Sequence, residues 1–416
     1  MTLISKKIPS AAARWIARSE GSDATIFVFT FEAKPIFGRT QLKILRVVTL
    51  ASATGKYGGP FDTAISQARL IANIDGQDVT LLAGHMRNDR PAIIGAKFEF
   101  VGRDVYRVLA RTGFFTCFSW KMLAEIFRQV RRVDIVHVSY AREFIPLMTS
   151  ALAIMFRKPL VLQPHGMLTT RTSAVHKVVD LLAAPMFRKA KRVIALTGVE
   201  RTQLEGWAHC NGENWIDVIG NPLPYVPSSE TGSPRSHKAV FIARLEPRKR
   251  VSDFVEARRI AHDNGWNEVY EVVGPDQGDG AAVQSAAESL PGLIYGGAIP
   301  SSSIEAVLGS AGVFVLTSDN EPWGNVLVAA LATDLPVVVT QSAALADEVD
   351  RNRLGLVVPD RDPRAVAEAV HRILGSNWRT AEEARAARDF ARKRFDQVEI
   401  RQKLLSTYIA ASEGRV

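Results

Sequence analysis

Residues 42–82 decide the fold class and read LKILRVVTLASATGKYGGPFDTAISQARLIANIDGQDVTLL. The apolar run at 42–50 predicts a buried strand, and the glycine-bearing segment 51–60 predicts a loop. Residues 61–74 have helical periodicity, and 78–82 predict a second strand. A strand, a glycine loop, a helix and another strand are the opening of a doubly wound α/β domain.

The same alternation continues along the rest of the chain. Further strands are expected at 135–138, 160–163, 193–196, 239–242, 268–273, 293–295, 313–316 and 336–339. The helices expected between them include 251–264, 302–310 and 323–332. A long helical stretch at 381–411 is expected to break near Arg394. Residues 1–41 are an extension of uncertain structure, with a candidate helix at 11–18 and a candidate strand at 24–31.

Residues 221–238 hold four prolines and four serines, a composition typical of an exposed linker. The chain therefore divides into a first domain at 42–220 and a second at 239–380, followed by a helical segment at 381–416. We expect two Rossmann-like α/β/α domains that face each other across a cleft. The terminal helix is expected to return to the first domain.

Length and composition narrow the class of protein. The 416 residues suggest about two domains, and 47% hydrophobic with 23% charged residues excludes a disordered chain. Two cysteines, Cys117 and Cys210, predict neither a disulfide framework nor a metal site. The longest apolar run, 145–156, is too short to span a bilayer, and no signal peptide is evident. A cytoplasmic protein is expected.

Charge is distributed unevenly along the chain. Residues 1–220 contain 30 Lys and Arg against 17 Asp and Glu, whereas residues 221–416 contain 22 against 26. Basic and apolar residues mix at 127–132 and 186–192, which is consistent with peripheral contact with an anionic membrane or a phosphorylated lipid. Helix ends whose cations complement the helix dipole are an equally good interpretation. No module typical of nucleic-acid binding is present in the sequence.

Two segments that follow predicted strands carry residues suited to a diphosphate. Arg244 and Lys249 follow the strand at 239–242, at the edge where open α/β sheets bind ligands. The second segment, Ser318 to Leu327, contains Glu321 and a helix start where Pro322 suits the first turn and Gly324 permits close approach to the backbone. Exposed amides at a helix start bind phosphate groups. Each segment alone is equally typical of an ordinary surface turn or helix cap.

Taken together, these segments and several others resemble the retaining GT-B glycosyltransferases of the E-x7-E type (group 1, glycosyltransferase family 4-like). The resemblance covers residue 42 to the end of the chain. The matching motifs are G-G-P (58–60), D-I-V-H (134–137), Q-P-H-G-M-L (163–168), I-A-L-T-G-V-E (194–200), G-N-P (220–222), A-R-L-E-P-R-K (243–249) and S-D-N-E-P-W-G-N-V-L (318–327).

The resemblance implies transfer of a hexose-type sugar from a UDP-, GDP- or ADP-linked donor to a glycan or lipid-linked hydroxyl, with retention of configuration. It implies a role in surface polysaccharide or glycolipid assembly, and no cofactor besides the donor. His165, Glu321, Arg244 and Lys249 would be catalytic. The donor would also contact Gly58, Gly59, Gly274, Ala298, Gly324, Asn325, Val326 and Leu327. His137 is expected to be structural. No metal is implied, and the sequence shows no D-x-D motif on a strand-end loop.

Two positions depart from the family pattern. Ala329 stands where the family has its second glutamate, which would hold the donor ribose. A lost hydrogen bond to a charged group is worth ~1.5–3 kcal/mol, so donor affinity could fall ~10–100-fold. Asp334 replaces a glycine and is expected to cap a turn or to add negative charge near the nucleotide. A non-catalytic binding member of the fold and a nucleotide-sugar epimerase therefore remain as alternatives.

Overall fold

The computed structural model describes residues 41–413, except 54–57, 88, 92, 94–95, 108–115, 169–173, 211–214, 224–235, 301–302 and 376–377. Residues from Gln41 onward group as one compact unit. The candidate helix at 11–18, the candidate strand at 24–31 and most of the expected linker lie outside the described residues.

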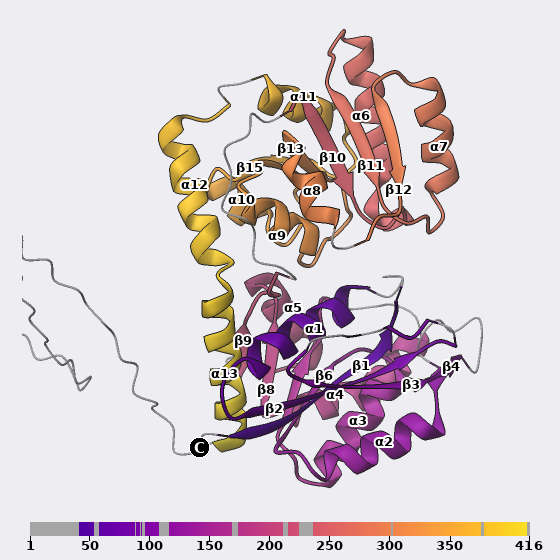
Figure 1. Ribbon diagram of the computed structural model, residues 1–416, viewed down its shortest axis with the longest axis vertical. Helices are drawn as coiled ribbons and strands as arrows, with labels where there is room; N and C mark the ends of the chain where they lie inside the picture. Colours follow the sequence, from indigo (N-terminus) through magenta and orange to yellow (C-terminus); the bar gives the residue numbers. More distant parts are fainter. Residues whose placement is uncertain are drawn as a thin grey trace, which may run out of the picture. The chain divides into compact units, whose positions relative to one another are not determined.

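The first domain is built on a parallel sheet whose strands are ordered β3-β2-β1-β6-β7-β8-β9 (Figure 1). Its strands are β1 (Leu42–Ala51), β2 (Gln77–His85), β3 (Glu99–Asp104), β6 (Ile135–Ser139), β7 (Leu160–Gln163), β8 (Arg192–Ala195) and β9 (Ile216–Val218). A short antiparallel pair, β4 (Tyr106–Arg107) with β5 (Cys117–Phe118), follows β3 in the chain and forms a separate two-stranded sheet.

Helices cover both faces of this sheet because its central strands are apolar on both sides. Leu45 and Val47 of β1 pack towards α2 (Trp120–Val130), α3 (Phe144–Met155), α4 (Ala174–Arg188) and α5 (Gly198–Ala208). Ile44 and Val48 pack on the opposite face towards α1 (Gly58–Ala72) and α13 (Gln397–Glu413). Strands buried on both faces are typical of doubly wound sheets.

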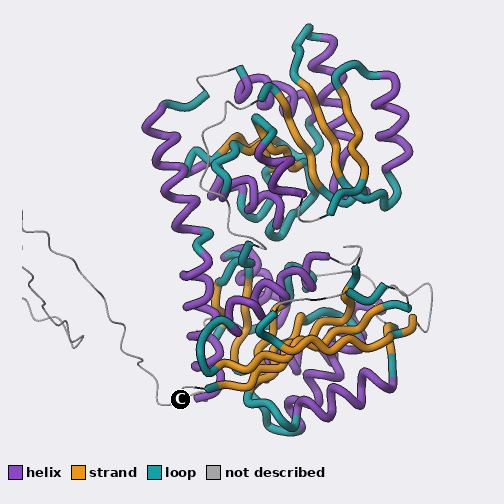
Figure 2. The backbone as a smooth tube through the Cα atoms, viewed as in Figure 1, coloured by secondary structure: helices purple, strands orange, loops and turns teal. Residues whose placement is uncertain are grey.

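The second domain repeats this plan with strands ordered β12-β11-β10-β13-β14-β15, all parallel. These are β10 (Lys238–Ile242), β11 (Val269–Val273), β12 (Leu293–Gly297), β13 (Val313–Leu316), β14 (Val337–Thr340) and β15 (Gly355–Val358). One face packs on α6 (Val251–Asp263), α7 (Gly280–Ser289) and α11 (Pro363–Leu374). The other packs on α8 (Ile304–Gly309), α9 (Asn325–Ala332), α10 (Ala346–Arg351) and α12 (Ala381–Arg394). Figure 2 shows both sets of strands between helices.

The C-terminal segment belongs to both domains. Helix α12 ends at Arg394 and α13 begins at Gln397, so the expected break near Arg394 is confirmed. Ala387 and Ala391 of α12 lie in a core of the second domain, whereas Leu404 and Tyr408 of α13 lie in a core of the first.

Helix α13 reaches the first sheet through a buried hydrogen bond. The Tyr408 hydroxyl lies 2.8 Å from Nδ1 of His137, in the middle of β6. Burial and the nearby Arg46 charge hold the pKa of His137 well below its ordinary value, so the ring is neutral. His137 is fully buried and has the structural position that the sequence suggested.

Three strands of the two parallel sheets were not expected from the sequence, and neither was the short β4–β5 pair. Strand β9 has only three residues, β15 begins with Gly355, and β3 carries a glycine and three charged residues. All three lie in the outer part of their sheets: β3, β9 and β15 are edge strands. An edge strand needs no long apolar run, and such strands therefore escape a search for buried runs.

The His137–Tyr408 bond can be tested by Tyr408→Phe. The substitution leaves Nδ1 of His137 buried without a partner, and we expect it to lower the free energy of unfolding by about 1–3 kcal/mol. Urea unfolding followed by tryptophan fluorescence measures the change. Tyr270→Phe is the matched control, because the buried Tyr270 hydroxyl has no hydrogen-bond partner among the described residues. An equal loss in both variants would contradict the prediction.

Candidate active site

Each sheet has one point where the order of its strands reverses. In the second sheet it lies between β10 and β13, and in the first between β1 and β6. Open α/β sheets bind ligands beyond the carboxyl ends of the strands at such a point, because the two flanking loops turn away from each other there. The residues predicted for the diphosphate and the sugar, Arg244, Lys249 and 321–327, follow β10 and β13, at the reversal of the second sheet.

The loops after β10 and β13 are joined by hydrogen bonds. The Thr317 hydroxyl donates to the carbonyl oxygen of Arg250 at 2.9 Å and lies 3.1 Å from that of Lys249. The amide of Asp319 donates to the carbonyl oxygen of Arg248 at 2.9 Å. Arg250 and Asn320 have positive φ angles of 54° and 48°, so each loop turns sharply at its contact with the other. The two loops form one unit.

A buried ion pair lies inside this unit. Lys249 Nζ donates to Oε2 of Glu321, and the two side chains are 12% and 7% exposed. Burial alone would raise the pKa of Glu321, but the charges of Lys249 and Arg248 offset it and hold that pKa below its ordinary value. Burial also lowers the pKa of Lys249, which Glu321 partly restores. The predicted residues Lys249 and Glu321 are therefore in direct contact.

Two further cations on the loop after β10 lie near this pair and are more exposed than it is. Arg244 and Arg248 are 40% and 41% exposed, and each approaches Glu246 only at 3.5 Å. Nη1 of Arg248 lies 3.6 Å from Oε2 of Glu321. Two cations, Lys249 and Arg248, therefore lie against one buried carboxylate, and the charge of Arg244 acts on Lys249. Sequence reasoning missed Arg248, although its place beside Lys249 in a single turn was a usable signal.

The start of α9 differs from the expectation. Pro322 and Trp323 precede the helix, and Gly324 caps it with a φ of 74°. A residue with a left-handed φ cannot lie inside a right-handed helix, so α9 begins only after Gly324 and the prediction that Pro322 occupies its first turn is wrong. The first bond within the helix runs from the amide of Val328 to the carbonyl of Gly324. The amides of Asn325, Val326 and Leu327 are therefore not used inside the helix and remain suited to an anion.

Gly274 and Ala298 lie at the same edge of the second sheet. Gly274 follows β11, and its amide donates to the carbonyl of Gly297 at 2.8 Å. A Cβ at Gly274 would lie 1.7 Å from the carbonyl oxygen of Ala243, just before Arg244, so only glycine fits there. Ala298 is exposed and directly follows β12. In the order of the sheet, β11 and β12 lie on one side of β10, and β13 lies on the other. Gly274 and Ala298 are therefore separated from the Glu321 loop by the loop that carries Arg244.

The two departures from the family pattern have different surroundings. Ala329 is 3% exposed and belongs to an apolar core of the second domain, where its methyl group offers no hydrogen bond to a ribose. Asp334 lies between α9 and β14, at the amino edge of the sheet, so the expected charge near the nucleotide is wrong.

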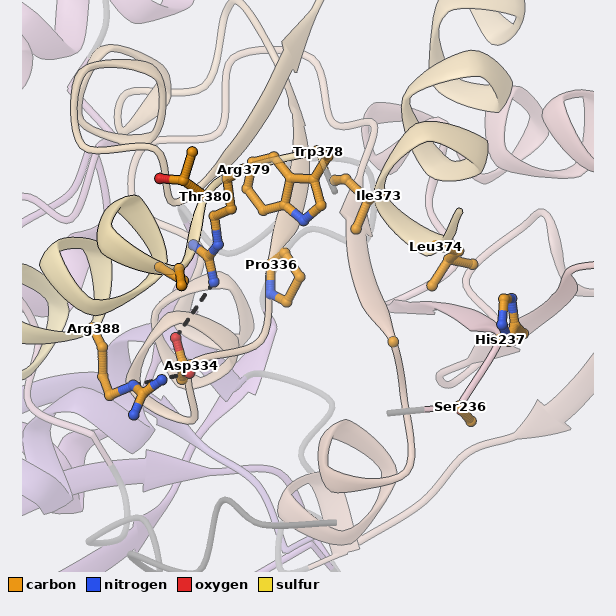
Figure 3. Close-up of a pocket in the computed structure, with 13 residues that line it drawn as sticks. Ser236, His237, Asp334, Pro336, Ile373, Leu374, Trp378, Arg379, Thr380 and Arg388 are labelled. Atoms are coloured by element: carbon orange, nitrogen blue, oxygen red, sulfur yellow. Dashed lines mark hydrogen bonds and ion pairs between the residues drawn. The ribbon is translucent and has the colours of Figure 1, made fainter. Parts of the chain in front are cut away.

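Asp334 instead holds helix α12 in place. It has a φ of 59°, and its carboxylate lies 3.1 Å from Nε of Arg388 and 3.6 Å from Nη2 of Arg379 (Figure 3). It lines a pocket of about 410 Å³ with Trp378 and Pro336. Because the pocket opens at the amino ends of β10, β13 and β14, it is separate from the site described above.

The predicted His165 lies at the carboxyl edge of the first sheet, in the turn after β7. It has a φ of 55° and is 8% exposed, and its Nε2 hydrogen-bonds with Oγ of Ser139 at 3.1 Å. Burial and the charge of Arg46 hold the pKa of His165 well below its ordinary value. Its Nδ1 has no partner among the described residues. His165 is therefore a neutral ring with one uncommitted nitrogen.

A carboxylate that sequence reasoning did not single out supports this turn. Glu200 accepts from the amide of Gly166 at 2.5 Å and from that of Leu196 at 2.6 Å. Gly166 has a φ of 74°, and a Cβ there would lie 2.3 Å from Cβ of Pro322. The turn that carries His165 therefore contacts the loop that carries Glu321. The signal in the sequence was the glutamate at the end of I-A-L-T-G-V-E.

Gly58 and Gly59 lie at the start of α1, after β1. Gly59 has φ 26° and ψ −91°, which is not helical, and nothing lies within 4 Å of where its Cβ would be. The chain there is open to approach by another group. Their predicted contact with a phosphate stays a prediction, because residues 54–57 of the same loop lie outside the described residues.

The described residues contain neither a cluster of three or more His, Cys, Asp or Glu side chains placed to bind a metal ion, nor a helix both long and apolar enough to cross a bilayer.

Family models match both domains. The model "Glycosyltransferase Family 4" matches residues 58–224, and "Glycosyl transferases group 1" matches residues 236–376. The chain belongs to this glycosyltransferase family. The two matches cover the first-domain turn of His165 and both donor-side loops of the second domain, in agreement with the resemblance drawn from the motifs.

Curated relatives match part of the chain. A GDP-mannose-dependent alpha-mannosyltransferase of Mycobacterium tuberculosis is 29% identical over 154 residues, 33% of this chain and 38% of the relative. A glycogen synthase of the same species is 26% identical over 177 residues, 42% of this chain and 43% of the relative. The chain thus spans less than half the length of these relatives in the matched regions.

Solved structures share the fold over most of the chain. HepE of Anabaena, in complex with UDP and glucose, has a TM-score of 0.67 and 19% identity, and covers 88% of this chain and 99% of its own. Sucrose-phosphate synthase of Thermosynechococcus elongatus has a TM-score of 0.68 and 17% identity, and covers 88% of this chain and 98% of its own. The expected fold of two parallel-sheet α/β domains, GT-B, is confirmed.

The Lys249–Glu321 pair gives this glycosyltransferase a specific pH dependence. Because the pKa of Glu321 is lowered on folding, the pair stabilises the protein above the ordinary carboxyl pKa. That contribution is lost as the pH falls through the lowered pKa. We expect Glu321→Gln to lower the free energy of unfolding at pH 7 by roughly 3 kcal/mol, the cost of breaking a buried pair. The difference from the wild type should shrink below about pH 4.5.

Urea unfolding at several pH values measures this difference. Glu246→Gln is the control, because Glu246 lies on the same loop but contacts its cations only at 3.5 Å. A gap between the wild type and Glu321→Gln that does not change with pH would contradict the assignment.

Proposed function

We propose that the chain transfers a hexose-type sugar from a nucleotide-sugar donor to an acceptor hydroxyl with retention of anomeric configuration. One observation carries the proposal: the Lys249–Glu321 pair, flanked by Arg244 and Arg248, lies beside the start of α9 at the reversal of the second sheet. Cations and free amides at one edge suit a diphosphate, and a carboxylate held ionised among them suits sugar hydroxyls.

The cations provide the main stabilisation of the reaction. As the bond from the anomeric carbon to the diphosphate breaks, negative charge grows on the leaving oxygens. Arg244 binds this charge as a fork and Lys249 as a point charge, and the amides of Asn325 and Val326 add donors. Fixed charges of this kind need no reorganisation when the bond breaks. In this proposal they take the place of a metal ion.

The sugar is oriented from both domains. Glu321 accepts hydrogen bonds from sugar hydroxyls, and Lys249 keeps its carboxylate ionised. The uncommitted Nδ1 of neutral His165 hydrogen-bonds with the sugar or the acceptor. The acceptor oxygen then attacks the anomeric carbon on the face from which the diphosphate leaves, and the acceptor proton passes to a leaving phosphate oxygen. An oxocarbenium-like transition state is expected, as in glycoside hydrolysis.

The acceptor class is proposed from the first domain. Residues 1–220 carry a net positive charge, which suits a phosphorylated lipid-linked or glycan acceptor at an anionic surface. Such acceptors are used in the assembly of surface polysaccharides and glycolipids, which we propose as the role of the enzyme.

A second candidate is a protein that binds nucleotide sugars without turnover. It is favoured by Ala329, which leaves the position of the second motif carboxylate apolar and buried. Release of the free nucleotide from UDP-, GDP- and ADP-sugars, with and without lipid-linked acceptors, separates the two candidates. Binding without release under every condition favours the second.

Donor binding tests the proposed site. We expect Arg244→Ala with Lys249→Ala to weaken the best donor at least ~100-fold, because hydrogen bonds to charged groups are worth ~1.5–3 kcal/mol each. Isothermal titration with the same donor measures the loss. Arg259→Ala with Arg351→Ala removes two cations from the surface of the same domain and is the control. Equal affinity of the double variant and the wild type would rule the site out.

His165 is tested by splitting binding from transfer. We expect His165→Ala to lower kcat ~10²-fold or more while donor affinity changes little, as for a group that acts mainly in the transition state. Because His165 is neutral at ordinary pH, the wild-type rate should show no inflection near pH 6.5 from this ring. A rate that is lost as a histidine protonates near that pH would contradict its assignment.

A further inference from the structure

The outer side of three helices in the first domain is apolar. Helices α2, α3 and α4 pack side by side on one face of the first sheet (Figure 1). Their large exposed hydrophobic side chains are Trp120 (77% exposed), Phe127 (42%), Met155 (60%), Val178 (64%), Leu181 (74%) and Leu182 (60%). A monomeric soluble protein rarely exposes a contiguous apolar patch of this kind without a binding role.

The central helix adds further apolar side chains to this face. Helix α3 lies between α2 and α4 and contains no charged residue. Its buried side includes Ile145 and Ala153, whereas Met148, Ala151 and Met155 are partly or fully exposed. A surface helix normally places polar residues on its outer side. Here the outer side of α3 is apolar like those of the two helices that pack on it.

Basic residues border this apolar face at one end. The three helices run in the same direction against the sheet and end at its amino edge. The basic residues at those ends are Arg128, Arg131, Arg132, Arg157, Lys158, Arg188, Lys189 and Lys191. The two basic segments noted in the sequence, 127–132 and 186–192, are therefore the ends of α2 and α4, on either side of α3, and lie at one edge of the sheet.

The few carboxylates on these helices are already engaged. Glu125 of α2 is buried and accepts from Arg103 and Arg128. Asp180 of α4 accepts from Arg142 and from the indole of Trp207. Neither is free to neutralise the basic edge. The face therefore combines apolar side chains with a net positive rim.

The rim is joined to the apolar face by aromatic contacts. The rings of Phe127 and Phe156 meet edge to face, with centroids 5.3 Å apart. The guanidinium of Arg131 lies over both rings, 5.5 Å and 5.9 Å from their centroids. A cation over aromatic rings at the end of an apolar face is suited to the boundary between lipid headgroups and acyl chains.

We propose that the outer face of α2, α3 and α4 docks on an anionic bilayer, with its apolar side chains in the interfacial layer and the basic rim on the headgroups. The positive charge of the rim favours a bilayer over a second copy of this chain as the partner of this face. A second copy would bring an identical positive rim against the first, whereas anionic lipid complements it. The surface stands on its own geometry at the amino edge of the first sheet; resting on the proposed function, it names the membrane that carries a lipid-linked acceptor as the place where the enzyme is held.

Vesicle flotation of the full chain tests the apolar part of the surface. The vesicles contain phosphatidylcholine alone or mixed with phosphatidylglycerol. We expect the wild type to float with the mixed vesicles, and Leu181→Ser with Leu182→Ser to weaken binding by roughly tenfold or more per leucine. Ile294→Ser with Val398→Ser is the matched control, because these exposed apolar residues lie on β12 and α13. It should float like the wild type.

The basic rim is tested in the same way. Arg132→Glu with Lys189→Glu should abolish the preference for mixed vesicles, whereas Arg259→Glu with Arg351→Glu in the second domain should keep it. Added salt should weaken wild-type binding but leave the part that depends on Leu181 and Leu182. Retained vesicle binding in both rim and leucine variants would overturn the proposal.

Two further readouts separate this inference from others. Sedimentation equilibrium gives the mass without lipid: a wild-type dimer that Leu181→Ser with Leu182→Ser converts to a monomer would overturn the proposal in favour of a second copy. Donor binding is measured in parallel. A leucine variant that binds donor normally but no longer floats supports the proposal. A wild type that transfers sugar without binding any vesicle refutes the surface and leaves the proposed function intact.

Discussion

The contact between Lys249 and Glu321 is the constraint on which the donor side depends. Two ionised groups with little exposure are tolerable only when each meets the other, since a lone buried charge costs several kcal/mol. The pair therefore fixes the loop after β10 against the loop after β13, and the positions of Arg244, Arg248 and the first amides of α9 follow from that. The same contact that stabilises the fold keeps Glu321 ionised for a ligand. Stability and chemistry are linked here through one carboxylate.

The first domain solves a similar problem with backbone donors. Glu200 is also a buried carboxylate, but it accepts amide hydrogens from both ends of the segment that it holds, and burial raises its pKa. Beneath this turn, Arg46 is 1% exposed, and Gln163 accepts one of its guanidinium hydrogens. Its uncompensated charge helps to keep His165 and His137 neutral. The two sides of the candidate site thus differ in their electrostatics. On the first-domain side the two histidines are held neutral. On the second-domain side the charged groups Lys249, Glu321 and Arg248 lie together.

The sequence predicted the parts of this protein that depend on long apolar runs and on motifs. The central strands, the break near Arg394 and the placement of Lys249 and Glu321 after two buried strands all follow from such patterns. Edge strand β9 did not, because three residues carry too little periodicity. The start of α9 was misplaced because proline is common in the first turn of a helix, and Pro322 was therefore put there. The helix begins only at Asn325, because Gly324 before it has a left-handed backbone conformation. The contact of Arg248 with Glu321 and those of Glu200 with the amides of Gly166 and Leu196 depend on which residues meet in space, although Arg248 and Glu200 both stand in motifs of the sequence.

The path of the C-terminal segment has a consequence for biosynthesis. Because α13 completes a core of the first domain, that domain is discontinuous in the chain, and the second domain is in effect an insertion within it. During translation the whole second domain leaves the ribosome before α13 does. The first domain, although it is synthesised first, is therefore completed after the second. Until then the surface that α13 will cover, including His137, is unshielded. The nascent first domain thus has an interval in which chaperones or premature association can act, set by translation speed and not by its own stability.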